Sequence, residues 1–282
     1  MQIPSMEQKL YKMNIKVPIR FFIVTFLWTW LLWMPFVLMG LGILNLNENV
    51  VTTFMMPMII AGAFGPAVGA TYSVITLEGK KELKIFLKSF LSLKFNWKLW
   101  VLIFIILGFI NIVAWYIPEL FGYDRIPMAI SNIYSFPVLL LFMVFFGGGQ
   151  EEIGWRGYIM PFLESKYGIW IGNIILGITW AVWHIPLWFV AGTSQTYMPF
   201  IAFLIGCIGL SFILSWMVKY SKGRPLSALI AHGYLNAFMN LFPIIIRENE
   251  AFQFHFWIHQ SLLLLIGIVT LRYFHKDIFK RN

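Results

Sequence analysis

The sequence predicts an all-α integral membrane protein, a polytopic bundle of about eight transmembrane helices. Three observations lead to this fold class. The 282-residue chain is 60% hydrophobic and only 12% charged, with a mean hydropathy of +0.77, whereas soluble domains carry about 25% charged residues. Its apolar residues gather into runs of about 20, the length that a helix needs to cross a bilayer. Its basic residues are concentrated in alternate connections between those runs.

The apolar runs, taken in order, give eight predicted spans at residues 21–40, 54–77, 99–118, 136–160, 169–191, 198–218, 226–246 and 253–271. The second and seventh are the least uniform, since they hold small or polar residues: Gly62, Gly65, Pro66, Gly69, His232, Gly233 and Asn236. Such residues are tolerated where neighbouring helices cover them. We treat the chain as one integrated membrane domain with three parts: N-terminal helices at 1–134, a core at 135–245, and a last helix with a basic tail at 246–282.

The positions of the basic residues predict the orientation. In an eight-span topology all but two of the 21 Lys and Arg residues fall on one side of the membrane, the exceptions being Arg125 and Arg247. The positive-inside rule makes that side cytoplasmic, so we expect both termini in the cytoplasm and the protein in the plasma membrane. This distribution also accounts for the net charge of +9. The expected partner of the basic residues is therefore the lipid bilayer and not a nucleic acid.

The connection at 79–96 is a separate element. Its larger apolar residues fall near one helical face and its lysines fall mostly off that face. This pattern is typical of a basic amphipathic helix on the anionic cytoplasmic leaflet. An ordinary basic loop with helical bias explains the pattern equally well.

Two carboxylates lie inside the fourth predicted span, one residue after three glycines at 147–149. Ionisable groups within a span cost roughly 2.5–3.5 kcal/mol each on insertion scales, so they indicate function. Glu152 and Arg156 are four residues apart and can pair on one helix face. Glu151 then points about 100° away and is free to act as a general base. Alternatively the span ends just before these charges and they are solvated; the apolar stretch at 157–163 favours the intramembrane position.

Two later spans carry further polar residues. Trp180 and His184 share a helix face, and Pro186 interrupts the helix beside the histidine. His232 and Asn236 share a face and could both offer hydrogen bonds to one anionic atom. Alone, a histidine at position 184 is more often a packing or interhelical hydrogen-bonding residue than a catalyst, whereas interhelical hydrogen bonding explains His232 and Asn236 as well as catalysis does. The other polar residues near these motifs or near the C-terminus are not assigned to the site: Asn240, His255, His259 and His275.

Taken together, the three motifs resemble the signature of the CPBP intramembrane proteases, the CAAX proteases and bacteriocin-processing proteins that are also called Abi. This family includes the type II CAAX prenyl endopeptidases. The resemblance covers about residues 135–245 and rests on the order and approximate spacing of Glu151, Glu152, Arg156, Trp180, His184, His232 and Asn236. One departure is Trp180, where the family usually has Phe, and the larger ring could reshape the pocket.

The resemblance implies an eight-helix fold with a catalytic cavity inside the membrane. It implies that Glu151 and His184 activate a water for peptide hydrolysis and that His232 and Asn236 stabilise the oxyanion. Glu152, paired with Arg156, would support the site.

The resemblance leaves the role of metal open. A zinc ion could bind Glu151, His184 and His232, with water as its fourth ligand. The same residues serve a metal-free glutamate mechanism equally well. The His-Glu-x-x-His helix typical of zinc proteases is absent from the sequence, so we favour the metal-free mechanism.

The predicted function is an intramembrane endopeptidase. Its expected substrate is a membrane-associated or lipidated peptide or protein, such as a prenylated CAAX substrate, which enters from the bilayer or the cytoplasmic side. One alternative is a non-enzymatic membrane scaffold or bacteriocin-immunity protein that uses the same fold. A second is a proton-coupled transporter with Glu151 as proton carrier, which would need polar residues in the outer half of the spans, where the sequence has few. The sequence leaves the oligomeric state open.

Overall fold

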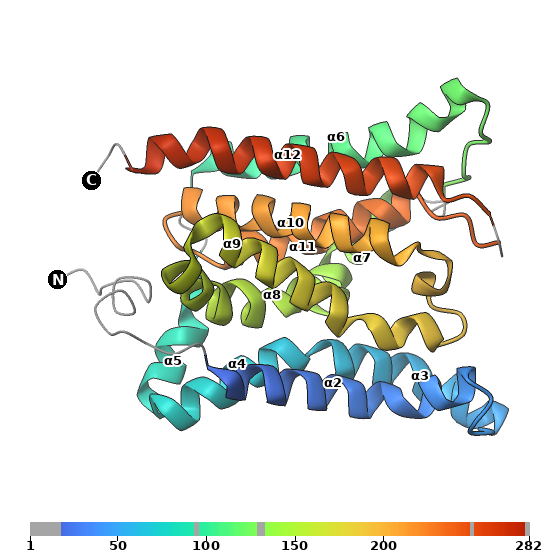
Figure 1. Cartoon of the computed structure of the whole chain (residues 1–282), viewed down its shortest axis with the longest axis horizontal. Coiled ribbons are helices and arrows are strands. Elements are labelled where there is room, and N and C mark those ends of the chain that lie inside the picture. The colour runs from blue at the N-terminus through green and yellow to red at the C-terminus, as the bar shows by residue number, and fades with distance from the viewer. Residues whose placement is uncertain (1–17, 93–95, 129–132, 249–250, 280–282) are drawn as a thin grey trace.

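A computed structural model describes residues 18–92, 96–128, 133–248 and 251–279 of the chain. Within these residues the regular structure is entirely helical, so the predicted all-α membrane bundle is confirmed. Most helices run side by side along one direction (Figure 1). Large apolar side chains such as Ile23, Leu31, Ile105 and Leu141 are exposed over the outside of the bundle, as expected of a surface that faces lipid.

The longer helices are α2 (Ile19–Gly40), α3 (Glu48–Ala63), α4 (Gly65–Leu77), α5 (Lys80–Ser89), α6 (Trp97–Tyr116), α7 (Phe136–Phe145), α9 (Met160–Trp183), α10 (Phe200–Tyr220), α11 (Leu226–Leu241) and α12 (Phe254–Phe279). Short elements join them: η1 (Ile117–Phe121), η2 (Ile133–Ser135), η3 (Gly149–Glu151), α8 (Glu152–Gly154), the π-turn η4 (Trp155–Ile159), η5 (Ile185–Phe189) and η6 (Ser194–Tyr197).

The predicted count of eight spans is not confirmed by helix length and composition. In the described residues five helical stretches are long and apolar enough to cross a membrane, and a sixth is the pair α3 and α4, bent by 45°. One stretch, Ile133–Phe189, contains the predicted span 136–160 and nearly all of the predicted span 169–191. The predicted seventh span corresponds to α11, whose 16 residues make it shorter than expected. Eight membrane crossings therefore stay a prediction.

A turn at Gly168 divides the long stretch into two arms. Gly168 has φ +76°, a left-handed conformation that glycine adopts at little cost. Beyond it the chain folds back, so that a Cβ on Gly172 would lie 3.0 Å from the carbonyl carbon of Leu163. Further along the arms, the rings of Trp155 and Trp183 meet at 5.8 Å. This hairpin brings the residues around 151 next to those around 184.

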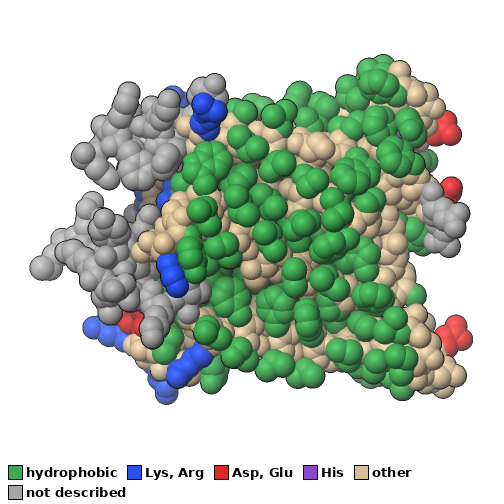
Figure 2. All heavy atoms as spheres, in the orientation of Figure 1, with side chains coloured by type: hydrophobic (Ala, Val, Ile, Leu, Met, Phe, Trp, Pro, Cys, Tyr) green, Lys and Arg blue, Asp and Glu red, His purple; other side chains and the backbone are tan. Residues whose placement is uncertain are grey.

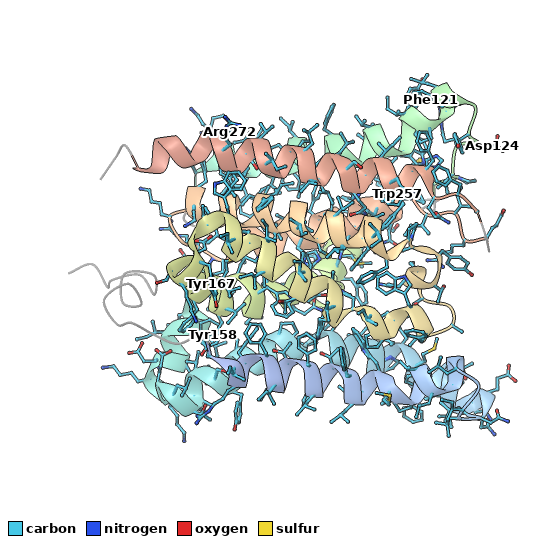
Figure 3. The ribbon with its side chains drawn as sticks, in the orientation of Figure 1. Phe121, Asp124, Tyr158, Tyr167, Trp257 and Arg272 are labelled. Carbon is cyan, nitrogen blue, oxygen red and sulfur yellow. The ribbon has the colours of Figure 1, made fainter. Side chains whose placement is uncertain are left out.

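The two ends of the bundle differ in charge. In the view of Figure 2, Lys and Arg side chains gather at the end where α5 lies, with an acidic side chain among them, and Asp and Glu side chains are seen at the other end. Helix α2 begins and α12 ends near the basic end (Figure 1). Figure 3 places Arg272 towards this end and Asp124 at the opposite one.

Helix α5 occupies the first part of the predicted amphipathic segment at 79–96, of which residues 93–95 lie outside the described residues. Its lysines are exposed, while Phe86 is buried. The ring of Phe86 contacts those of Phe90 and Tyr158 at 5.4 and 6.3 Å. Part of its apolar face therefore packs on protein; its contact with the leaflet stays a prediction.

Candidate active site

The site forms where the helix of the fourth predicted span is broken. Helix α7 ends at Phe145, and Gly148 has φ +128°, which a side chain would strain. The glycines also admit the neighbouring helix α11: a Cβ on Gly149 would lie 2.6 Å from the carbonyl oxygen of Leu229. The tight turn η3 that follows carries Glu151, and α8 begins with Glu152.

Glu152 is fully buried and forms the centre of a charged group. Its Oε2 lies 2.9 Å from Arg156 Nη1, which confirms the pairing predicted from their spacing. Its Oε1 lies 2.9 Å from His232 Nδ1, a contact that the sequence did not predict. The guanidinium of Arg156 lies 4.9 Å from the ring centre of Trp180. Glu152 thus fixes the imidazole of His232 through Nδ1.

Glu151 is buried and has no ion pair with Arg156, as predicted, but it is not free of partners. Its Oε2 accepts a hydrogen bond of 2.8 Å from Trp180 Nε1. Trp180 was predicted only as an aromatic neighbour of His184. A Phe at this position could not donate this bond, so the indole nitrogen orients Glu151 in a way specific to Trp.

His184 lies where α9 ends, as Pro186 predicts. Its Nδ1 is 2.9 Å from the carbonyl oxygen of Trp180. Because a carbonyl oxygen only accepts, Nδ1 carries the proton, and Nε2 of the neutral ring is left as an acceptor. Helix α2 supports this corner: Trp183 Nε1 donates to Thr29 Oγ1 at 2.9 Å, and Trp30 Nε1 donates to the Trp183 carbonyl at 3.0 Å.

His232 and Asn236 converge on one point beside Gly148. A Cβ on Gly148 would meet the Nδ2 atom of Asn236 and would lie 2.8 Å from His232 Nε2. Asn236 Nδ2 donates one of its two hydrogens to the Gly147 carbonyl at 2.7 Å. Its second hydrogen is available for another acceptor. The predicted pair therefore offers two nitrogen atoms to the same small volume.

Four of the six predicted site residues line one cavity of about 1200 Å³: Glu151, His184, His232 and Asn236. The other two, Glu152 and Arg156, are buried behind it. The cavity wall is otherwise largely apolar, with Ile59, Ile60 and Phe142 among its residues. The described structure thus brings two hydrogen-bond acceptors, Glu151 and Nε2 of His184, into the same mainly apolar cavity as two nitrogen atoms that could donate, those of His232 and Asn236.

Comparison with known proteins agrees with the motifs. Residues 133–238 match the family model described as Type II CAAX prenyl endopeptidase Rce1-like. The chain is also 25% identical over 281 residues to a "CAAX prenyl protease 2" of Methanococcus maripaludis, and the alignment covers 96% of this chain and 98% of the relative. The chain is thus similar to Rce1-like CAAX prenyl endopeptidases. The resemblance inferred from the motifs is confirmed, and all six predicted site residues fall within the matched region.

This similarity supports an intramembrane endopeptidase activity. The zinc site considered from the sequence is not supported by the geometry. Among the described residues, no three His, Cys, Asp or Glu side chains are grouped so that they could hold a metal ion. We therefore derive no step through a metal.

The cavity is also lined by residues that sequence analysis left out of the site, among them Cys207, Asn240 and His259. The chain positions of Cys207 and His259 in α10 and α12 carry no motif that points to the cavity. Only the packing of α10 and α12 against the core shows their position.

Proposed function

We propose that this protein hydrolyses a peptide bond of a membrane-associated substrate with a water activated by Glu151 and His184. The proposal rests on one observation above all. The acceptors Glu151 and His184 and the donors His232 and Asn236 line the same cavity. The similarity to the Rce1-like family model supports the class of reaction, and the geometry suggests the role of each residue.

The reaction begins with a water held between the Glu151 carboxylate and Nε2 of His184. Glu151 takes a proton from the water while the water oxygen attacks the carbonyl carbon of the substrate. The negative charge that develops on the carbonyl oxygen is stabilised by hydrogen bonds from His232 Nε2 and Asn236 Nδ2. Glu151 then returns the proton to the amide nitrogen as the C–N bond breaks, so that one water is consumed.

Glu152 and Arg156 act as positioning residues. His232 can donate from Nε2 while Nδ1 faces Glu152 if the ring is doubly protonated. The Glu152 carboxylate compensates that charge, and Arg156 in turn holds the carboxylate. The buried ion pair would fix the donor geometry without touching the substrate.

The substrate we propose is a lipidated peptide, of which a prenylated CAAX-type peptide is the first to test. The relative of this chain is named a CAAX prenyl protease. The apolar wall of the cavity, with Met56, Met143 and Phe146 among its residues, suits a lipid chain or an apolar peptide segment. We further propose that the protein lies in the plasma membrane with both termini in the cytoplasm, as the distribution of basic residues predicts.

The test is cleavage of a fluorogenic prenylated peptide by purified protein in detergent. Loss of the general base should lower kcat by roughly 10²–10⁴-fold, so we expect Glu151→Gln and His184→Ala to be nearly inactive. Glu48→Gln, a change at an exposed carboxylate outside the cavity, is the matched control and should retain activity. Activity of wild type should persist with a chelator. Cleavage that survives Glu151→Gln would refute the mechanism.

A further inference from the structure

Helix α5 carries a basic and apolar hollow on the outside of the protein. The hollow has a volume of about 410 Å³ and is lined by lysines and leucines spaced three and four residues apart along α5 and the turn after it: Lys80, Leu83, Lys84, Leu87, Lys88 and Leu91. In the described part of the chain, none of these residues lines the cavity that holds Glu151. The hollow is therefore a surface separate from the catalytic cavity.

The lysines of the hollow are open to a ligand. Lys80, Lys84 and Lys88 are exposed, and within the described residues none of them forms an ion pair. Like charges four residues apart on a helix repel one another and destabilise it. An anion bound between these ammonium groups removes that repulsion.

The leucines of the hollow call for an apolar partner. Leu87 and Leu91 are 44% and 78% exposed. With 3.6 residues per turn, the leucine row lies between the lysine row and the buried residues Phe86 and Phe90. A ligand that suits both rows has a negative head and an apolar chain.

The neighbouring elements place α5 where lipid headgroups meet acyl chains. Helix α4 ends at Leu77, which is 53% exposed, and α6, a candidate span, begins at Trp97, which is 68% exposed. Tryptophan is enriched at the membrane–water interface. Figure 1 shows α5 at the end of the bundle where α2 begins. The amphiphile present at this level of the bundle is a phospholipid.

We propose that this hollow is a binding site for an anionic phospholipid. The phosphate lies between Lys84 and Lys88, and an acyl chain lies along the leucine row. A site of this kind goes beyond the general contact with the leaflet that the sequence of 79–96 predicts, because it requires particular lysines and leucines and not the basic charge of the segment alone.

The bound lipid is linked to the catalytic site through the buried face of α5. The ring of Phe90 packs against Gly157, where an added Cβ would meet its Cζ atom. Gly157 lies in the π-turn η4, directly after Arg156, which pairs with Glu152. A lipid that holds α5 in place therefore also holds the turn that positions Arg156. This link rests on the proposed protease function, whereas lipid binding does not.

Binding is measured by native mass spectrometry of the purified protein with dioctanoyl phosphatidylglycerol, and with dioctanoyl phosphatidylcholine for comparison. The double variant Lys84→Gln with Lys88→Gln should bind phosphatidylglycerol roughly 25-fold more weakly than wild type, since each lysine near an anionic lipid contributes about fivefold. Lys81→Gln with Lys98→Gln removes the same charge at exposed positions outside the hollow and should bind as wild type does. Equal losses in the two double variants, or equal affinity of wild type for the two lipids, overturn the proposal.

Two competitors and one further variant identify the ligand. Glycerol 3-phosphate has the phosphate without acyl chains and should leave the lipid bound, whereas Leu91→Gln should weaken lipid binding. Displacement of the lipid by an equal concentration of glycerol 3-phosphate would assign the hollow to a soluble phosphate. Displacement by an equal concentration of poly-glutamate peptide would assign it to an acidic protein partner. Either displacement overturns the proposal.

The link to the catalytic site is tested by cleavage of the prenylated peptide in nanodiscs. Phosphatidylglycerol should raise the kcat of wild type relative to phosphatidylcholine. This rise should be lost in Lys84→Gln with Lys88→Gln and kept in Lys81→Gln with Lys98→Gln. An equal rise in both double variants would mean that the lipid acts on the substrate, and it overturns the link. Absence of cleavage in every nanodisc would count against the protease function instead, and the binding measurement would still decide the lipid site.

Discussion

Replacement of Glu152 by Gln tests whether Glu152 stabilises the structure of the site without taking part in the reaction. Glu152 is fully buried and contacts Arg156 and His232, each at 2.9 Å. Glu152→Gln leaves the Arg156 guanidinium, itself buried, without its counterion. Removal of one partner of a buried ion pair costs about 3–5 kcal/mol. At the roughly 2–4 °C per kcal/mol typical of larger domains, this predicts a fall in Tm of about 10 °C.

The neighbouring change Glu151→Gln provides the contrast. The carboxylate of Glu151 accepts one hydrogen bond, from Trp180, and a Gln side-chain oxygen can accept it instead. We therefore expect Glu151→Gln to keep the wild-type Tm within about 1–2 °C while it abolishes cleavage. Both Tm values are measured by thermal unfolding of purified protein in one detergent.

A double mutant tests whether the ion pair is the cause. In Glu152→Gln with Arg156→Met the uncompensated charge is absent, so much of the lost stability should return. Two results would show that Glu152 and Arg156 do not act as a pair. One is a Tm of Glu152→Gln equal to that of wild type. The other is a stability loss in the double mutant equal to the sum of the losses in the two single mutants.

Three further changes test other parts of the site. Asn236→Ala removes one oxyanion donor and should lower kcat by roughly 10²–10³-fold with little change in KM; peptide-cleavage kinetics measure both, and a rise in KM alone would contradict this role. Gly148→Ala should abolish cleavage, because its Cβ would collide with Asn236. Gly168→Ala is the control: it has the same strain of a positive φ, but its Cβ would have no atom within 4 Å, so it should remain active. Equal losses of activity in the two variants would disprove the steric explanation. Gly177→Ala places a Cβ 2.6 Å from the Cα of Ile208 and should lower Tm by pushing α9 away from α10; an unchanged Tm would mean that α9 and α10 can separate at no cost.

The part of the site that could be predicted from sequence is the part set by helical spacing. Glu152 and Arg156 pair because they are four residues apart, and the same spacing places His232 and Asn236 on one face. The contact between Glu152 and His232 joins residues 80 positions apart. It depends on the approach of α11 to the break before α8, which periodicity within one segment cannot reveal.

The limits of the fold prediction have a similar origin. Apolar runs located the helices because a bilayer requires apolar surface on each of them. They did not show that the fourth span is broken at residues 146–149, since glycines are compatible with both helix and turn. The role of the N-terminal half was also hidden: Thr29 and Trp30 of α2 hold Trp183 beside His184, but no motif marks them.

The break in the helix before the site frees backbone groups, and neighbouring side chains form hydrogen bonds with them. Backbone groups freed inside a membrane protein must find partners, because lipid offers none. The backbone N–H of Gly148 donates to Gln150 Oε1 at 2.9 Å, and the carbonyl of Gly147 accepts from Asn236 Nδ2 at 2.7 Å. Asn236 therefore has two functions in our proposal: one of its hydrogens stabilises the broken backbone and the other points to the place where the oxyanion forms. Since the first hydrogen bond fixes the direction of the second, the unwound segment that exposes Glu151 also orients one of the donors that its reaction needs.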